Sequence, residues 1–308
     1  MSALGELRRV RDKGGEQGRK RDDLTAYLFL LPWLVGLLTI TAGPVVASLV
    51  LGFTDYNLIQ PPTFNGLDNF TRMLTDERLH HALGVTFTYV LISVPVQLAC
   101  ALGLALLLDR GLRGMAFYRS VFYLPSMLGT SVAIAVLWRQ IFGADGMVNQ
   151  VLAMVGVEGR GWISDPGTAL STLIVLNVWT FGAPMIIFLA GLRQIPRMYY
   201  EAAEVDGAGR WTQFRRVTLP LLSPIIFFNL VLQLIHAFQS FTQAFVVSDG
   251  TGGPSDSTLF YTLYLYQRGF KNFDMGYASA LAWLLLVIIA VFTALNFAAA
   301  RRWVFYDD

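Results

Sequence analysis

The stretch from Glu201 to Pro220 joins two strongly apolar segments and combines residue types that suit docking to another protein. Glu201 offers a fixed negative charge, and Ala202 and Ala203 beside it leave a thin face that another surface can approach closely. Gly207 follows a run of good helix formers, a position where glycine commonly ends a helix and turns the chain. The pattern predicts an elbow whose thin face another surface can approach closely.

The residues around that turn predict a short helix on each side of it. Pro196 suits the first turn of a helix that continues over residues 197–206. Residues 211–217 can form a second helix, which Leu219-Pro220 should break because proline lacks an N–H group and crowds the preceding turn. We therefore expect residues 193–222 to form a helix-turn-helix elbow.

A line of polar side chains runs through the apolar segment that follows the elbow. Its members recur at spacings of 4, 3, 4 and 3 residues, the period of one helix face: Asn229, Gln233, His236, Ser240 and Gln243. Gln239 flanks this line, and Asn177, Trp179 and Thr180 lie in the preceding apolar segment. Neutral hydrogen-bonding groups near an aromatic ring suit a sugar, whose hydroxyls need donors and acceptors. We interpret the set as a substrate path; the alternative is that these residues join helices through hydrogen bonds inside a membrane.

Several other functions are disfavoured by the residues present. His80 and His81 lack metal-ligand spacing, and Cys100, the only cysteine, is expected to be an apolar packing residue, so we expect no metal site and no catalytic residues. A net charge of +2 without a basic cluster disfavours nucleic acid. No charged residue lies in the middle of the last three apolar segments and no internal repeat is visible, which argues against an ion-coupled secondary carrier.

The composition is that of a membrane protein. Hydrophobic residues make up 55% of the 308 residues, charged residues only 14%, and the mean hydropathy is +0.52. Six apolar segments are each long enough to cross about 30 Å of hydrocarbon as a helix: Leu24–Leu51, Ala82–Leu108, Phe117–Trp138, Ala169–Leu192, Ser223–Val247 and Tyr277–Ala300. The sequence predicts an all-α protein with six transmembrane helices over residues 24–308.

Lysine and arginine are distributed unequally between the two sides of these six segments. Seventeen lie in the N-terminal stretch, the second and fourth connections and the C-terminal stretch, against 5 in the opposite loops. Because positive loops stay in the cytoplasm, both termini and the elbow are predicted to be cytoplasmic. Residues 1–23 are rich in charge and glycine, so we expect a disordered cytoplasmic tail there.

The elbow resembles the cytoplasmic loop of ABC importer permeases, the inner-membrane components of binding-protein-dependent transport systems. Their pattern is Glu-Ala-Ala, three residues, Gly, nine residues, an aliphatic residue, one more, then Leu-Pro. This chain meets every spacing, with Val217 where isoleucine is usual. The resemblance implies a type I importer fold and assigns docking to a separate ATPase to the following residues: Glu201, Ala202, Ala203, Gly207, Leu219 and Pro220.

The same resemblance implies partners and cofactors. A P-loop needs Gly-Lys followed by Ser or Thr, and none of the lysines here follows a glycine, so no cofactor is expected in this chain. ATP and Mg would be bound by the partner ATPase. The family pattern implies a heterodimer with a second permease subunit, two ATP-binding subunits, an extracytoplasmic solute-binding protein and surrounding membrane lipid, in the inner membrane of a bacterial or archaeal cell.

Other segments are similar to the carbohydrate-uptake branch, the relatives of maltose-type and glycerol-3-phosphate-type permeases. They are Phe64–Phe70, Phe122–Pro125, Asp249–Pro254, Tyr264–Tyr266 and Met275–Ala280. The branch implies import of a sugar or a related polyol by alternating access. Glycerol-3-phosphate-type cargo, an ion-coupled carrier and an intramembrane enzyme remain alternatives at this point.

Overall fold

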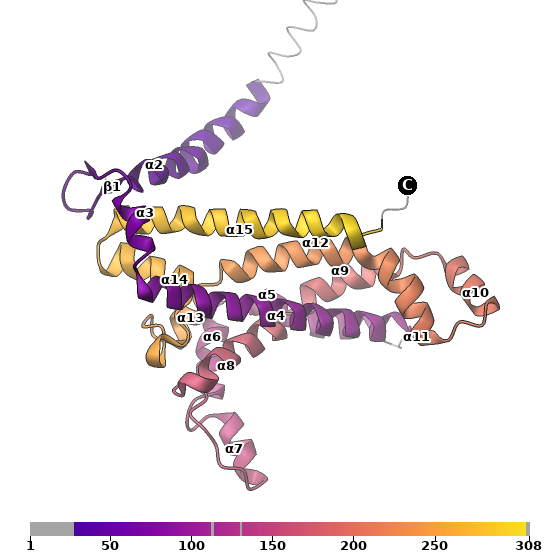
Figure 1. Cartoon of the computed structure of the whole chain (residues 1–308). Helices are drawn as coiled ribbons and strands as arrows, with labels where there is room; N and C mark the ends of the chain where they lie inside the picture. The colour runs from indigo at the N-terminus through magenta and orange to yellow at the C-terminus, as the bar shows by residue number, and fades with distance from the viewer. Residues whose placement is uncertain (1–27, 112–113, 130, 306–308) are drawn as a thin grey trace, which may run out of the picture.

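The computed structural model describes residues 28–111, 114–129 and 131–305, and helices account for most of these ranges (Figure 1). Four helical stretches there are long and apolar enough to cross a membrane: Leu28–Leu51, Glu77–Asp109, Arg210–Val247 and Met275–Trp303. Two bent helix pairs raise the number to six if each pair is one span. The tail predicted over residues 1–23 lies outside the described residues.

The elements follow one another along the chain in two groups. The first contains η1 (Leu37–Ala42), α2 (Gly43–Leu51), β1 (Thr54–Asp55), β2 (Thr63–Phe64), α3 (Asp68–Met73), α4 (Glu77–Asp109), α5 (Met115–Leu128), α6 (Val132–Ile141) and α7 (Met147–Met154). The second contains α8 (Pro166–Trp179), α9 (Gly182–Leu192), α10 (Arg197–Val205), α11 (Arg210–Gln213), η2 (Phe214–Thr218), α12 (Leu219–Phe238), α13 (Thr242–Val247), η3 (Pro254–Asp256), α14 (Tyr261–Tyr266), η4 (Gln267–Lys271) and α15 (Met275–Trp303). The strands β1 and β2 form one antiparallel hairpin.

The N-terminal helix, residues 28–51, extends away from the rest of the protein (Figure 1). None of its most apolar window is buried among the described residues. Its last part, α2, contacts α15, and Gly52 after it lies beside Ala280. The predicted first span is confirmed over residues 28–51, while residues 24–27 lie outside the described part.

α4 is the central helix of the bundle. It contacts α8, α9, α12 and α14. Ala82, Ala101 and Ala105 on α4 are completely buried, and their small side chains let the neighbouring helices approach closely. At the α14 end of the bundle the core is aromatic, with Tyr261 and Tyr264 completely buried.

Two predicted spans are broken, which corrects the expectation of continuous helices. The span predicted over 117–138 is divided into α5 and α6, which differ in direction by 98°, and the hydroxyl of Ser131 caps α6. The span predicted over 169–192 is divided into α8 and α9, with a bend of 40°. Pro184 offers no N–H group to the carbonyl of Thr180 four residues earlier, so the helical hydrogen-bond ladder is interrupted there.

The span predicted over 223–247, the last part of the stretch Arg210–Val247, is also locally interrupted. α12 ends at Phe238 and α13 begins at Thr242. Phe241 between them has φ −133° and ψ −56°, outside the helical region. The carbonyl of Ser240 accepts a hydrogen bond from the hydroxyl of Thr262, which satisfies a backbone group in this break. The polar line of this segment therefore does not lie on one continuous helix.

Candidate functional site

A polar cavity of about 450 Å³ lies where α4, α5, α8, α9, α12 and α13 meet. It is lined by Gln97, Ser126, Asn177, Thr180, Ala183, Pro184, Gln233, His236, Gln239, Ser240, Phe241, Thr242 and Gln243. Asn177 and five of the six polar residues predicted after the elbow are among them, so residues from separate spans come together here. His236 and Gln239 are exposed, and Gln233, Ser240 and Gln243 are half-buried.

Two residues of the predicted substrate path lie outside this lining. Asn229 is completely buried on α12 and donates from Nδ2 to the carbonyl of Ile225, 3.1 Å away in its own helix. Trp179 packs beside Trp138 instead, with ring centroids 6.0 Å apart. Their positions fit packing between helices better than contact with a solute.

The polar groups in the cavity wall are all neutral. Ser240 donates to Oε1 of Gln243 at 3.2 Å, and Nε2 of Gln243 donates to the carbonyl of Gly129 at 3.2 Å. Amides, hydroxyls and one imidazole offer both donors and acceptors, and the lining contains no Asp, Glu, Lys or Arg. Among the described residues no group of three metal-binding side chains occurs either. The arrangement can bind a neutral, hydroxyl-rich solute.

Three polar residues of this wall were not predicted from the sequence: Gln97, Ser126 and Thr242. Gln97 is the only amide side chain in α4, and Ser126 is one of two serines in α5. On α4 the buried residues Thr86, Tyr89, Ser93 and Gln97 recur at spacings of 3, 4 and 4, so Gln97 belongs to a polar helix face that was not identified. A buried amide in an apolar span was the available signal, since such a group needs partners on another helix.

The predicted elbow is present at the end of the bundle where α10 and α11 lie (Figure 1). Gly207 adopts φ +77°, the left-handed conformation that favours glycine, and turns the chain between the two helices. Nε2 of Gln213 donates to the carbonyl of Ala208 at 3.1 Å and fixes the second helix against the turn. Glu201 and Ala202 are exposed and Ala203 is half-buried, so α10 presents them outward.

Leu219-Pro220 does not break the second helix, contrary to expectation. α11, η2 and α12 follow one another without interruption from Arg210 to Phe238. η2 is a π-helical turn, in which the N–H of Leu219 donates to the carbonyl of Phe214 five residues earlier. The wider turn accommodates Pro220, which has no N–H for the usual bond to residue 216. One helix thus connects the elbow to the polar cavity.

Residues 80–304 match the family described as the binding-protein-dependent transport system inner membrane component. The chain belongs to this family. The permease is 51% identical over 291 residues to a probable ABC transporter permease of Bacillus subtilis, YesP, with 94% of each chain covered. It is 33% identical to the lactose transport system permease LacF of Rhizobium radiobacter, over 91% of this chain and 95% of LacF.

The fold of the permease matches that of a solved importer. A chain of a bacterial ABC transporter involved in import of the acidic polysaccharide alginate has a TM-score of 0.79 and 25% identity, covering 93% of the permease and 98% of that chain. The predicted type I importer fold and the inner-membrane location are confirmed. The permease is a transport subunit and not an enzyme, and in such systems the ATPase is a separate subunit.

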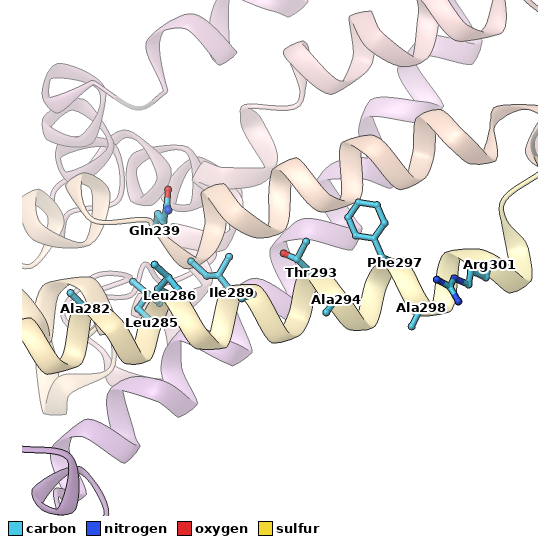
Figure 2. Close-up of a pocket in the computed structure, with 11 residues that line it drawn as sticks. Gln239, Ala282, Leu285, Leu286, Ile289, Thr293, Ala294, Phe297, Ala298 and Arg301 are labelled. Carbon is cyan, nitrogen blue, oxygen red and sulfur yellow. The ribbon is translucent and has the colours of Figure 1, made fainter. Parts of the chain in front are cut away.

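The permease also has an apolar cavity of about 910 Å³ along α15 (Figure 2). Apart from Gln239, Thr293 and Arg301, its lining is alanine, leucine, isoleucine and phenylalanine. Gln239 lines this cavity as well as the polar one, so it stands between the two. An apolar wall offers a hydrated solute little hydrogen bonding, so of these two cavities the polar one is the better candidate for a solute site.

Proposed function

We propose that this permease carries a carbohydrate through the membrane by way of the polar cavity. The observation that carries the proposal is the cavity itself: a wall whose polar groups are neutral amides, hydroxyls and one imidazole, at helix breaks in three predicted spans. Backbone that is not helical is tolerated at membrane depth where it lines a cavity, and transporter sites are commonly built this way. The names of the relatives LacF and AraP, for lactose and arabino-oligosaccharides, support the same class of solute.

The proposed solute contacts are the predicted residues that line the cavity. They are Asn177, Gln233, His236, Gln239, Ser240 and Gln243. Asn229 and Trp179 would support the surrounding helices, as their own contacts indicate. A phosphate ester is less suited to this wall than a sugar, because its charge would have no Lys or Arg partner among the lining residues.

The elbow is the proposed attachment to the ATPase, with Glu201, Ala202, Ala203 and Gly207 at the contact. The continuous helix from Arg210 to Phe238 supports this role, because displacement of the elbow would move Gln233 and His236 directly. In this mechanism ATP-driven closure of the ATPase pulls the elbow, and the cavity alternates between the two sides of the membrane. The permease itself supplies binding and movement, while ATP and Mg belong to the partner.

The proposed complex contains a second permease subunit as a heterodimer partner, two ATP-binding subunits and an extracytoplasmic solute-binding protein. Both termini and the elbow would face the cytoplasm, which the distribution of lysine and arginine supports. The exposed apolar N-terminal helix supports the need for lipid or a second membrane subunit, since apolar surface of that extent must be covered.

The test is uptake by the complete transporter in proteoliposomes. Labelled mono- and oligosaccharides and glycerol-3-phosphate would be supplied with the binding protein, with and without ATP inside. We expect ATP-dependent accumulation of at least one saccharide and none without the ATPase subunits. Accumulation of glycerol-3-phosphate alone would overturn the carbohydrate assignment, and uptake by the permease without ATPase would overturn the importer mechanism.

A further inference from the structure

The breaks of three spans meet at the polar cavity. The α8–α9 break is at Thr180, the α12–α13 break is at Ser240, and Gly129 lies at the end of α5. Gln243, just beyond the α12–α13 break, donates to the carbonyl of Gly129, which links two of these regions directly. α4 runs past them as a single helix and contributes one polar residue to the cavity, Gln97.

The side-chain amide of Gln97 bonds to two residues at the α8–α9 break, Thr180 and Asn177. Its Nε2 donates to Oγ1 of Thr180 at 2.9 Å and to the carbonyl of Thr180 at 3.3 Å. Its Oε1 accepts from Nδ2 of Asn177 at 3.4 Å. Because Pro184 leaves the Thr180 carbonyl without its helical partner, Gln97 supplies a bond that the backbone cannot.

Ser126 completes the same connection from α5. Its hydroxyl donates to the carbonyl of Thr180 at 3.2 Å and accepts from the N–H of Ala183 at 2.8 Å. α9 approaches α5 so closely here that a Cβ on Gly182 would lie 2.3 Å from the carbonyl oxygen of Phe122. The first turn of α9 is therefore held between α4 and α5, with little freedom to rotate.

We propose that Gln97 is a positioning residue of the permease: it fixes the α8–α9 break and thereby orients Asn177 and the first turn of α9 toward the cavity. Gln97 is 1% exposed, so it acts through Thr180 and Asn177 and not by binding the solute itself. The inference rests on the proposed function in that it takes the polar cavity as the solute path. The orientation of α9 that it predicts is measurable without any solute.

The first test measures the reactivity of cysteines placed in the cavity. Cys100 is replaced by serine, and single cysteines are introduced as Ala183→Cys on α9 or Gln243→Cys on α13. Both positions line the cavity, but only Ala183 directly follows the α8–α9 break, which Gln97 bonds through Thr180. The purified complete transporter is treated with a hydrophilic methanethiosulfonate reagent, with Gln97 intact or changed by Gln97→Met, which keeps the length and removes the hydrogen bonds.

Gln97→Met should change the modification rate at Ala183→Cys by about tenfold, because cross-helix hydrogen bonds are lost, and leave the rate at Gln243→Cys within about twofold. Unchanged rates at both cysteines would overturn the proposal. Equal changes at both would also overturn it, because they would indicate general loss of structure. Uptake is not needed for this result, so failure of the carbohydrate assignment would be seen separately.

The second test approaches the same bond from Thr180 and covers the case in which Gln97→Met fails to assemble. Thr180→Val has nearly the same shape but removes the hydroxyl that accepts from Gln97, whereas Thr180→Ser keeps it. Thr180→Val should reproduce the selective change at Ala183→Cys, and Thr180→Ser should restore the original rate. Equal rates for the valine and serine variants would contradict the positioning role.

Discussion

The phenol of Tyr277 donates a 2.8 Å hydrogen bond to Oδ2 of Asp76, a residue 201 positions earlier in the chain. The same oxygen accepts from the hydroxyl of Tyr264 and lies 3.4 Å from Nη2 of Arg268. Oδ1 of Asp76 caps α4 by accepting from the N–H of Leu79 at 3.1 Å. One carboxylate thus joins α4, α14, η4 and α15 at the end of the bundle opposite the elbow (Figure 1).

Removing the charge of Asp76 should destabilise the permease. Asp76→Asn keeps the shape but places an amide among three donors, so we expect a loss of roughly 2–4 kcal/mol in the free energy of unfolding. The measurement is the thermal unfolding midpoint of the purified transporter. Asp68→Asn is the matched control, because Asp68 is exposed and forms no ion pair among the described residues. Equal midpoints for the two variants would contradict the prediction.

The same carboxylate sets a pH dependence. Burial acts to raise the pKa of Asp76, but the hydrogen bonds from Tyr264 and Tyr277, the Leu79 N–H and the charge of Arg268 outweigh it, so its pKa lies below the usual 3.8. A lowered pKa in the folded state stabilises the protein above the unfolded pKa, and this contribution disappears as the pH falls through the folded value. The difference in unfolding midpoint between the parent protein and Asp76→Asn should therefore be constant from about pH 7 to 5 and shrink below about pH 4. A difference that shrinks already between pH 7 and 5 would show that another group is responsible.

Two substitutions of Gly207 distinguish backbone strain at this position from loss of the proposed ATPase contact. A Cβ at this position would meet no atom within 4 Å. A substitution therefore destabilises the protein mainly through the left-handed backbone conformation, by about 1–2 kcal/mol. Alanine and tryptophan should lose a similar backbone conformational free energy. Gly207→Trp should nevertheless abolish ATP-dependent uptake, while Gly207→Ala retains a substantial part of it. Uptake and membrane insertion are measured for both. Equal uptake in the two variants would contradict the proposal that the elbow contacts the ATPase.

How far the sequence predicts this structure depends on the kind of signal. Gly207 was predictable, because a glycine after a helix-forming run has a local conformational reason. The helix break predicted at Pro220 was wrong, because a π-helical turn that accommodates proline has no comparable local sequence pattern. The break at Thr180 lies in an apolar segment whose composition is that of a continuous span. Gln97 and Asp76 acquire their roles from residues far away in the chain, which only the packed fold reveals.

Pro220 provides a prediction about the helix that connects elbow and cavity. Pro220→Ala restores an N–H that can bond to the carbonyl of residue 216, which should convert η2 to a regular α-helical turn and rotate the elbow relative to α12. We expect the helix to become more stable and uptake to fall several-fold at unchanged assembly. Thermal unfolding and ATP-dependent uptake are measured together. Full uptake with an unchanged midpoint would mean that the π-helical turn has no part in the transmission.

Asn229 and Gln233, two amides one helical turn apart on α12, should respond differently to the same change. Gln233 lines the polar cavity, whereas Asn229 is completely buried and bonded to its own helix. Gln233→Leu should reduce uptake of the transported saccharide by roughly 10-fold or more with little effect on the unfolding midpoint, because a solute hydroxyl loses its partner. Asn229→Leu should leave uptake nearly unchanged, because Oδ1 of Asn229 has no hydrogen-bond partner among the described residues and removing the amide leaves no new donor unpaired.

The comparison needs uptake rates and midpoints for both variants in the same transporter. Loss of uptake in Asn229→Leu with full uptake in Gln233→Leu would reverse the assignment and move the solute path toward the elbow side of the cavity.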